Sequence, residues 1–346
     1  LVVKVTMAND RMQLTVWRGD WGLPSVDPHC LSALAYCKFS GIPVDVTKTG
    51  NPWNSPSGNF PVLHYRSETF AKVKDIFSFF RKENWGSDLE LSAQQSADVV
   101  AFSAMLEDRL HPALLHLWWM DDKTFIDVTR PWYANAIPFP LSLFHPRRKQ
   151  KKAELRVLLT KGGDYITDAE TEAKVYKEAK ECLNLLSYKL GDKPYMFGRL
   201  PSSLDALVFG YLAPLLKAPL PSNQLQTHLL QCENLCRLCN DVLTVFFPAD
   251  IKELSENTRQ NEQSKKKNVN KSDLSEFPHR RRNIILAVIF AVTAMVGYAL
   301  THGLIQVTIS DPDSSVSVRP GKSIMRDLKP QKHVDILEEP DVGVEE

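Results

Sequence analysis

Ser202 to Lys217, SSLDALVFGYLAPLLK, is the stretch that decides how this chain folds. Its first residues form a capping box. Ser202 at the N-cap can accept a hydrogen bond from the backbone N–H of Asp205, and the Asp205 carboxylate can accept one from the Ser202 N–H. The third helical residue of such a box is usually Glu or Gln, but Asp also suits the positive end of a helix dipole. The box predicts a helix over Ser203 to Lys217 and a role in folding rather than in chemistry.

The first eighty residues alternate between strand and helix patterns. Ser25 fits an N-cap and Gly41 a helix end. Pro61 follows a loop rich in Gly, Pro, Asn and Ser and begins a strand, which suits a cis peptide bond. The expected elements are a strand at Met12 to Trp17, a helix at Val26 to Phe39, a strand at Ile42 to Val46, a strand from Pro61 and a helix at Phe70 to Arg81.

After residue 91 the composition becomes helical. We expect helices over Leu91 to Met120, Glu172 to Leu190 and Gln224 to Phe247. Pro131 to Pro146 holds four prolines and many aromatics, so we expect it to wrap rather than to form one element. The soluble part is therefore expected to comprise an α/β domain at residues 10–83 and an all-helical domain at 91–248.

These features resemble the glutathione-transferase architecture. In that family a thioredoxin-like N-terminal domain precedes a helical domain, a cis-proline precedes the third strand, and a Ser-x-x-Asp box begins a central helix. Pro61 and the Ser202/Asp205 pair fall in those places. The resemblance implies an α/β plus all-α fold of this type.

Ile284 to Ile305 is a run of 22 residues without a formal charge. As a helix it would be about 33 Å long, enough to cross a hydrocarbon core of about 30 Å. Arg280, Arg281 and Arg282 precede it, and such basic residues resist translocation, so the N-terminal body should stay in the cytosol. A buried core helix is the alternative, but the flanks are polar. The sequence predicts a C-terminal transmembrane anchor.

Two polar segments flank this run. Residues 249–282 hold nine basic and six acidic residues and almost no aromatics, which is typical of a flexible linker. Residues 306–346 hold five basic and nine acidic residues, and we expect a disordered acidic tail.

Several motifs resemble the metaxin family more specifically. They are WGLPSVD (Trp21 to Asp27), NPW (Asn51 to Trp53), SPSG (Ser55 to Gly58), FPLSLF (Phe139 to Phe144), EAKECLNLLS (Glu178 to Ser187) and LDALVFGYLAPL (Leu204 to Leu215). RRRN and AMVGYAL at the C-terminal helix point to the tail-anchored metaxin one type. The resemblance implies a subunit of the mitochondrial outer-membrane sorting and assembly machinery, which supports protein import and β-barrel insertion. It also implies a second metaxin and other subunits of that machinery as partners, and a link to cristae-organising complexes.

Transferase chemistry is the alternative. The resemblance would place a thiol-stabilising residue after the first strand, where Ser25 is the candidate for a vestigial thiol site and fits a helix N-cap equally well. It would place a Glu/Gln-Ser pair near Lys72 and Val73, which cannot repeat its contacts with glutathione. We expect no catalytic residue, metal or cofactor. A tail-anchored glutathione-binding enzyme or sensor, and an adaptor for mitochondrial organisation and transport, stay open as other functions.

Each of the remaining polar and reactive groups has a structural and a functional interpretation. Cys232, Cys236 and Cys239 follow one helical stripe, which fits small core residues or a metal or redox site. The basic run of Arg147, Arg148, Lys149, Lys151 and Lys152 fits a solvated helix start or contact with anionic headgroups or an acidic partner. An aromatic cluster fits core packing, or a patch for a second subunit if its members are exposed: Trp118, Trp119, Trp132, Tyr133, Phe139 and Phe144. The net charge of +1 argues against a nucleic-acid binder.

Overall fold

The computed structural model describes residues 11–139, 141–160, 168–221, 223–250 and 280–301. The chain divides into two units, Leu1–Lys271 and Ser272–Glu346, which are described separately. The finer boundaries at 10–83 and 91–248 stay predictions. Most of the expected linker and all of the expected acidic tail lie outside the described residues.

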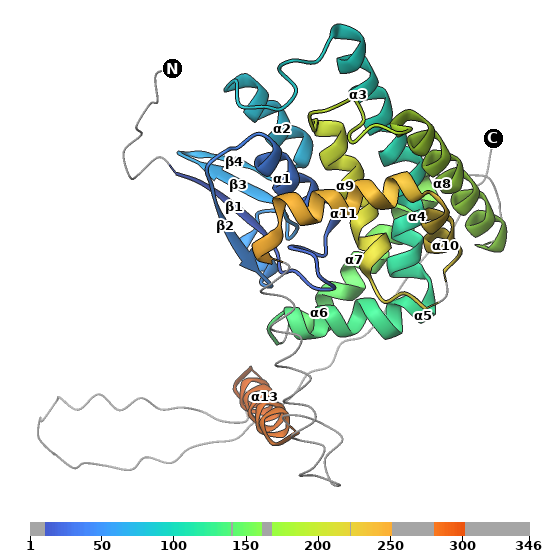
Figure 1. Ribbon diagram of the computed structural model, residues 1–346. Helices are drawn as coiled ribbons and strands as arrows, with labels where there is room; N and C mark the ends of the chain where they lie inside the picture. The colour runs from blue at the N-terminus through green and yellow to red at the C-terminus, as the bar shows by residue number, and fades with distance from the viewer. Residues whose placement is uncertain (1–10, 140, 161–167, 222, 251–279, 302–346) are drawn as a thin grey trace, which may run out of the picture. The chain divides into compact units, whose positions relative to one another are not determined.

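A four-stranded mixed sheet forms the N-terminal part of the first unit (Figure 1). Its order is β2-β1-β3-β4, with β1 parallel to β2 and antiparallel to β3, and with β3 antiparallel to β4. Leu14 on β1 lies opposite Val46 on β2 and Leu63 on β3. The strands are β1 (Met12–Trp17), β2 (Val44–Thr49), β3 (Val62–Tyr65) and β4 (Glu68–Phe70).

Helices make up the rest of this unit, and they gather beside the sheet (Figure 1). They are α1 (Pro28–Phe39), η1 (Pro52–Asn54), α2 (Val73–Lys82), α3 (Ala93–Met105), η2 (Leu106–Leu110), α4 (His111–Leu115), η3 (His116–Met120), α5 (Asp122–Thr124), η4 (Phe125–Thr129), α6 (Arg130–Ala136), α7 (Leu141–Thr160), α8 (Asp168–Leu190), α9 (Ser203–Lys217), α10 (Gln224–Gln231) and α11 (Glu233–Phe246).

Helix α9, in the helical part, packs directly against α1 beside the sheet. A Cβ atom at Gly210 would clash with Ser32 Oγ and with the carbonyl oxygen of Pro28, so only glycine allows α1 and α9 to approach this closely. Most residues of α9 are buried, from Ser203 through Leu215. The predicted helix is thus confirmed with its bounds, at the centre of the helical part.

Two backbone predictions are confirmed. The Phe60–Pro61 peptide bond is cis. The capping box at Ser202 and Asp205 has both of its reciprocal hydrogen bonds. The first strand, Met12–Trp17, also has the predicted bounds.

The predicted cap of the first helix was wrong. α1 begins at Pro28, and Asp27 is its N-cap, with the Asp27 carboxylate accepting from the backbone N–H groups of His29 and Cys30. Ser25 lies two residues earlier and accepts a long hydrogen bond of 3.4 Å from the Asp27 N–H, so it does not cap the helix. Proline suits the first helical position, where its missing N–H has no partner to lose, so Pro28 fixes the start.

Two helical predictions need correction. The expected helix at 224–247 is interrupted at Cys232, whose ψ of 73° ends α10 before α11 begins. α7 begins at Leu141, inside the stretch expected to wrap, and it contains Pro146. The basic run at 147–152 therefore lies within a 20-residue helix and does not precede one.

The second unit contains α13 (Arg280–Thr301). This helix covers most of the predicted membrane span, whose residues 302–305 lie outside the described part of the chain. Among the described residues, no helix is found that is both long and apolar enough to cross a bilayer. The transmembrane helix predicted at Ile284 to Ile305 is thus not found there.

Candidate functional site

The candidate site lies at the C-terminal end of β1, where Trp17 is fully buried. Four rings contact the Trp17 indole edge-on, with centroids 5.1 to 6.2 Å away. Such edge-to-face pairs stabilise a cluster beyond the area that they bury. The four rings come from three segments of the chain: Phe60 before β3, Trp132 and Tyr133 on α6, and His145 on α7.

Lys149 of α7 places its ammonium group among these aromatic rings. Its Nζ atom lies 5.0 Å from the Trp17 ring centroid, 5.2 Å from that of Tyr133 and 5.9 Å from that of Trp119. Nζ also donates a hydrogen bond of 3.2 Å to the Tyr133 hydroxyl. Cation–π contacts away from water are each worth about 1–2 kcal/mol. The site therefore already holds a cation, and the chain itself supplies it.

Acidic and thiol groups complete the surroundings of this ammonium. Burial by itself lowers the pKa of Lys149, but attraction to Tyr133 and Asp27 outweighs it and raises that pKa. Burial also raises the pKa of the Tyr133 hydroxyl and, most strongly, that of the Cys30 thiol, with the Asp27 carboxylate adding to the rise at Cys30. At neutral pH Lys149 is thus charged, whereas Tyr133 and Cys30 are neutral.

His145 closes the cluster on the side of α7. Its Nε2 atom lies 3.3 Å from the Gly58 carbonyl oxygen. Burial and the nearby Lys149 charge lower the pKa of His145 to about 4, so the imidazole is neutral at pH 7. Within the described part of the chain, the buried Nδ1 of His145 and Nε1 of Trp17 have no hydrogen-bond partner.

Ser25, the candidate thiol-site residue, is 0% exposed. It lies beside Cys30, whose thiol pKa it helps to lower through a side-chain hydrogen bond. A bound thiol would have to displace packed side chains to reach this hydroxyl. At the second expected subsite, Lys72 is the N-cap of α2 without a side-chain capping bond, and Val73 is buried. At both positions the buried side chains, Ser25 and Val73, therefore pack within the fold rather than facing a ligand.

Asp205 is fully buried at the start of α9 and accepts several hydrogen bonds. Its Oδ1 accepts from Met196 N at 2.8 Å, and its Oδ2 accepts from Ser202 N at 2.8 Å and Ser202 Oγ at 2.6 Å. Burial raises the pKa of Asp205 to about 6, although these hydrogen bonds oppose the rise. The box ties the Met196 loop to α9, which is a structural role.

The six cysteines are all free, and most are buried. Cys232 ends α10, and Cys236 and Cys239 follow on α11, so the three do not share one continuous helix. Burial raises the pKa of each of these thiols. Among the described residues, no group of three or more His, Cys, Asp or Glu side chains is arranged to hold a metal ion. The burial of Cys232 and Cys239 therefore fits small residues packed in the core.

The aromatic cluster predicted from sequence separates into two sets. Trp119 and Tyr133 are buried, and Trp118 and Trp132 are half-buried. Trp118 stacks on Trp21 with the ring centroids 5.6 Å apart. Phe139 and Phe144 are 64% and 70% exposed. Of these six rings, the two phenylalanines are therefore the most available to a partner.

The sequence did not identify Trp17, Asp27 or His145 as members of this site. Lys149 was grouped with four neighbouring bases, as part of a solvated helix start or of a contact with anionic headgroups or an acidic partner. One available signal was the spacing of Lys149, Ala153 and Val157, which recur every four residues as one helix face does. That spacing would have placed Lys149 on the buried face of the helix and its basic neighbours on the exposed face.

Comparisons with known proteins agree with this architecture. A family model described as an outer mitochondrial membrane transport complex protein matches residues 30–150, and one for the glutathione S-transferase C-terminal domain matches residues 179–242. The mixed sheet and the helical part confirm the predicted glutathione-transferase-like fold. Among solved structures, the β-etherase LigF from Sphingobium sp. strain SYK-6 is 14% identical with a TM-score of 0.47, covering 71% of this chain and 99% of that one. That score is too low to support any inference.

Relatives of known sequence are much more similar. Metaxin-1 of Macaca fascicularis is 44% identical over 310 residues, which cover 89% of this chain and 95% of that protein. Metaxin-3 of Danio rerio is 46% identical over 237 residues, which cover 68% of this chain and 76% of that protein. Identity at this level over most of both lengths shows common descent, and the chain therefore belongs to the metaxin family.

Proposed function

We propose that this chain is a non-enzymatic subunit of the mitochondrial outer-membrane sorting and assembly machinery, where it supports protein import and β-barrel insertion. The observation that carries the proposal is the match of residues 30–150 to an outer mitochondrial membrane transport complex family, within a chain whose metaxin relatives match over most of its length. A second metaxin and other subunits of the machinery would be its partners, with a link to cristae-organising complexes.

The geometry at the end of β1 supports a docking role rather than catalysis. An enzyme that conjugates thiols needs an accessible group to stabilise the thiolate, and the Ser25 hydroxyl is buried. The Lys149 side chain lies among the aromatic rings at the same end of the strand. The body would thus act through its surface.

The membrane part of the proposal assigns Ile284 to Ile305 as an anchor, with the N-terminal body in the cytosol. The support is the uncharged run of 22 residues after Arg280, Arg281 and Arg282. Along α13, apolar side chains that would be buried in a protein core are more than half exposed, among them Val288, Phe290 and Met295. This exposure supports the proposed anchor.

Depletion and rescue test the proposal. Mitochondria depleted of the protein should assemble an imported porin precursor slowly, as followed on native gels. Re-expression of the wild-type chain should restore assembly, and so should Ser25→Ala, because no chemistry is assigned to that hydroxyl. Unchanged porin assembly after depletion would contradict the proposal. Rescue by the wild type but not by a stably folded Ser25→Ala variant would instead favour a thiol-dependent activity.

A further inference from the structure

Helix α7 is held in place by one of its faces. Lys149 reaches into the aromatic cluster, and Ala153 and Val157 are buried one and two turns further on. Gln150 Nε2 donates a hydrogen bond of 3.0 Å to the Trp119 carbonyl oxygen. These contacts fix which residues of α7 face outward.

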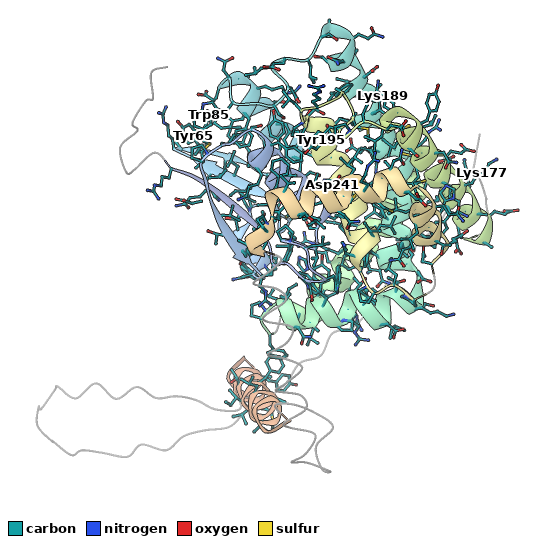
Figure 2. All side chains as sticks on the ribbon, in the orientation of Figure 1. Tyr65, Trp85, Lys177, Lys189, Tyr195 and Asp241 are labelled. Atoms are coloured by element: carbon teal, nitrogen blue, oxygen red, sulfur yellow. The ribbon has the colours of Figure 1, made fainter. Side chains whose placement is uncertain are left out.

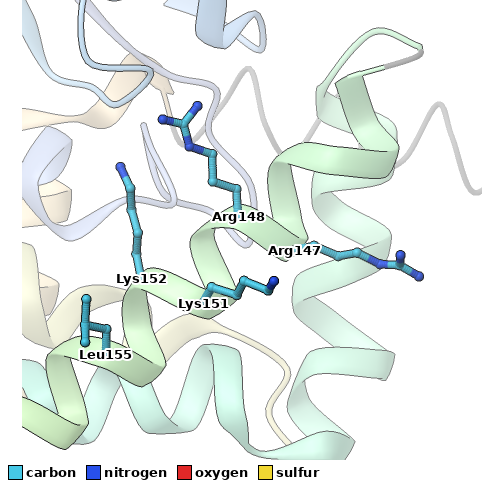
Figure 3. Close-up of a pocket in the computed structure, with 5 residues that line it drawn as sticks. All are labelled: Arg147, Arg148, Lys151, Lys152 and Leu155. Atoms are coloured by element: carbon cyan, nitrogen blue, oxygen red, sulfur yellow. The ribbon is translucent and has the colours of Figure 1, made fainter. Parts of the chain in front are cut away.

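The opposite face carries four exposed bases around an open hollow (Figure 3). Arg148 and Lys152, one turn apart, extend to the same side of the helix, and Arg147 extends to the other side. Leu155 is the one apolar residue lining the hollow with Arg147, Arg148, Lys151 and Lys152. The charged ends therefore extend to more than one side of the helix, so an extended anionic surface laid against this face would meet several of them.

Apolar side chains border these bases at both ends of the helix. Phe144 lies before them and is 70% exposed, and Leu159 follows them and is 67% exposed. Phe139, just before α7, is also exposed. A cluster of exposed bases on a helix surface is suited to contact with anionic lipid headgroups, and the apolar neighbours add surface that lipid can cover.

The charges favour an anionic surface as the occupant. Among the described residues, no ion pair joins a carboxylate to any of the four bases, whereas Arg156 on the same helix lies 3.8 Å from Asp108. The four bases are therefore available to external phosphates. Each base near an anionic membrane adds to the attraction between the helix and the lipid surface.

We propose that this outward face of α7 (Arg147, Arg148, Lys151, Lys152 and Leu155, with Phe144) binds the phosphate headgroups of anionic phospholipids. The inference rests on the proposed membrane anchor. The 29 residues at 251–279 between the described parts span at most about 100 Å when fully extended, so the anchor confines the body near the bilayer. The anchor raises the effective concentration of the α7 face at the membrane, so even weak binding to headgroups would hold this face against the lipid.

Hydrogen exchange of the full chain in lipid nanodiscs tests the proposal. Backbone amides at 141–160 should exchange at least about fivefold more slowly in discs of phosphatidylcholine with phosphatidylglycerol than in discs of phosphatidylcholine alone, since one base near an anionic surface already gives a factor of that size. A variant with Arg147→Gln, Arg148→Gln, Lys151→Gln and Lys152→Gln should lose the difference. Tryptophan fluorescence must show that this variant unfolds at the wild-type temperature.

A matched control neutralises four exposed bases elsewhere: Lys123→Gln, Arg130→Gln, Lys174→Gln and Lys177→Gln. Lys177 lies on the outer side of α8 (Figure 2). This control should keep the full effect of phosphatidylglycerol, because its substitutions leave the α7 face unchanged. Loss of the effect in the control as well would show that net charge alone matters, and would overturn the proposed site.

The other outcomes separate this inference from the proposed function. If the chain stays in the discs but α7 exchanges equally in both lipids, the headgroup site is wrong and the anchor stands. If the chain is not retained by the discs, both are wrong. If a polyglutamate peptide slows exchange at α7 in neutral discs while phosphatidylglycerol does not, the face binds acidic protein segments and the lipid proposal is overturned.

Discussion

Asp205 and Lys149 are two buried or half-buried charges of opposite sign that are stabilised in different ways. Backbone and hydroxyl donors surround the Asp205 carboxylate at 2.6 to 2.8 Å. Aromatic faces and one hydroxyl surround the Lys149 ammonium. The carboxylate is held by residues within ten positions of it, whereas the ammonium is held by strands and helices distant in sequence.

This contrast separates a local folding signal from a tertiary site. The Asp205 box can form as soon as α9 does, because its donors Ser202 and Met196 are close in sequence. The Lys149 contacts require β1, α6 and α7 to be in place, since they involve Trp17 and Tyr133. Substitutions at the two positions should therefore differ in size and kind.

The largest effect is expected from Asp205→Ala. It would leave the N–H groups of Met196 and Ser202 buried without acceptors, and each such group costs about 1–3 kcal/mol. The free energy of unfolding should fall by about 3–5 kcal/mol, as measured by denaturant unfolding of the full chain in detergent with tryptophan fluorescence. Asp192→Ala, at an exposed acid, is the control. A loss below about 1 kcal/mol at Asp205 would contradict a structural role for the box.

The contribution of Asp205 to the free energy of unfolding should depend on pH. The pKa of Asp205 is about 6 in the fold against an ordinary value of 3.8, so the folded state binds the proton more tightly than the unfolded chain. Its contribution is fully present below pH 3.8 and is lost as the pH rises through 6, a change of up to about 3 kcal/mol.

The comparison with Asp205→Asn isolates this titration. Burial lowers the pKa values of His111 and His145 to about 4, so these histidines contribute the opposite trend over the same range. They titrate in both proteins and cancel in the difference. The wild type minus Asp205→Asn difference should fall as the pH rises from 4 to 6, and a flat difference would mean that the pKa of Asp205 is not raised in the fold.

Lys149→Ala is expected to cost about 2 kcal/mol, because the aromatic rings lose a cation and several methylene groups. Lys149→Met keeps most of the aliphatic volume and should cost about 1 kcal/mol, which isolates the charge. Lys151→Ala, two residues away on the outward face, should be neutral within about 0.5 kcal/mol. Equal effects at 149 and 151 in unfolding experiments would show that the aromatic contacts add no stability.

Ser25→Ala should have the smallest effect. Its hydrogen bonds are weak, a long one of 3.4 Å from the Asp27 N–H and one with the Cys30 thiol, so the unfolding free energy should change by less than about 1 kcal/mol. Porin assembly in rescued mitochondria should stay at the wild-type rate. A slower rate with unchanged stability would give this hydroxyl a functional role.

The sequence predicted local features well and distant ones poorly. The strand at Met12–Trp17, the helix at Ser203–Lys217 and the cis bond before Pro61 follow from short patterns, and all three are confirmed. The cap of α1 was misassigned because Ser25 and Asp27 both suit an N-cap, and only the position of Pro28 decides between them.

The candidate site was harder to predict. Pro146 in the aromatic and proline-rich stretch hid the start of α7, so the five bases were interpreted together, as a solvated helix start or as a contact with an anionic partner. Without that helix, nothing distinguishes Lys149 from Arg148 or Lys151. The partners of Lys149 come from β1, η3 and α6, and one sequence carries no signal that joins them.

The Lys149 side chain and the aromatic rings fill the space at the end of β1, so the body should not bind glutathione there. Isothermal titration calorimetry of glutathione into the full chain in detergent tests it most directly. The account predicts no saturable heat for the wild type or for Ser25→Ala. Saturable binding to the wild type that is lost in Ser25→Ala, with the fold intact by tryptophan fluorescence, would contradict it.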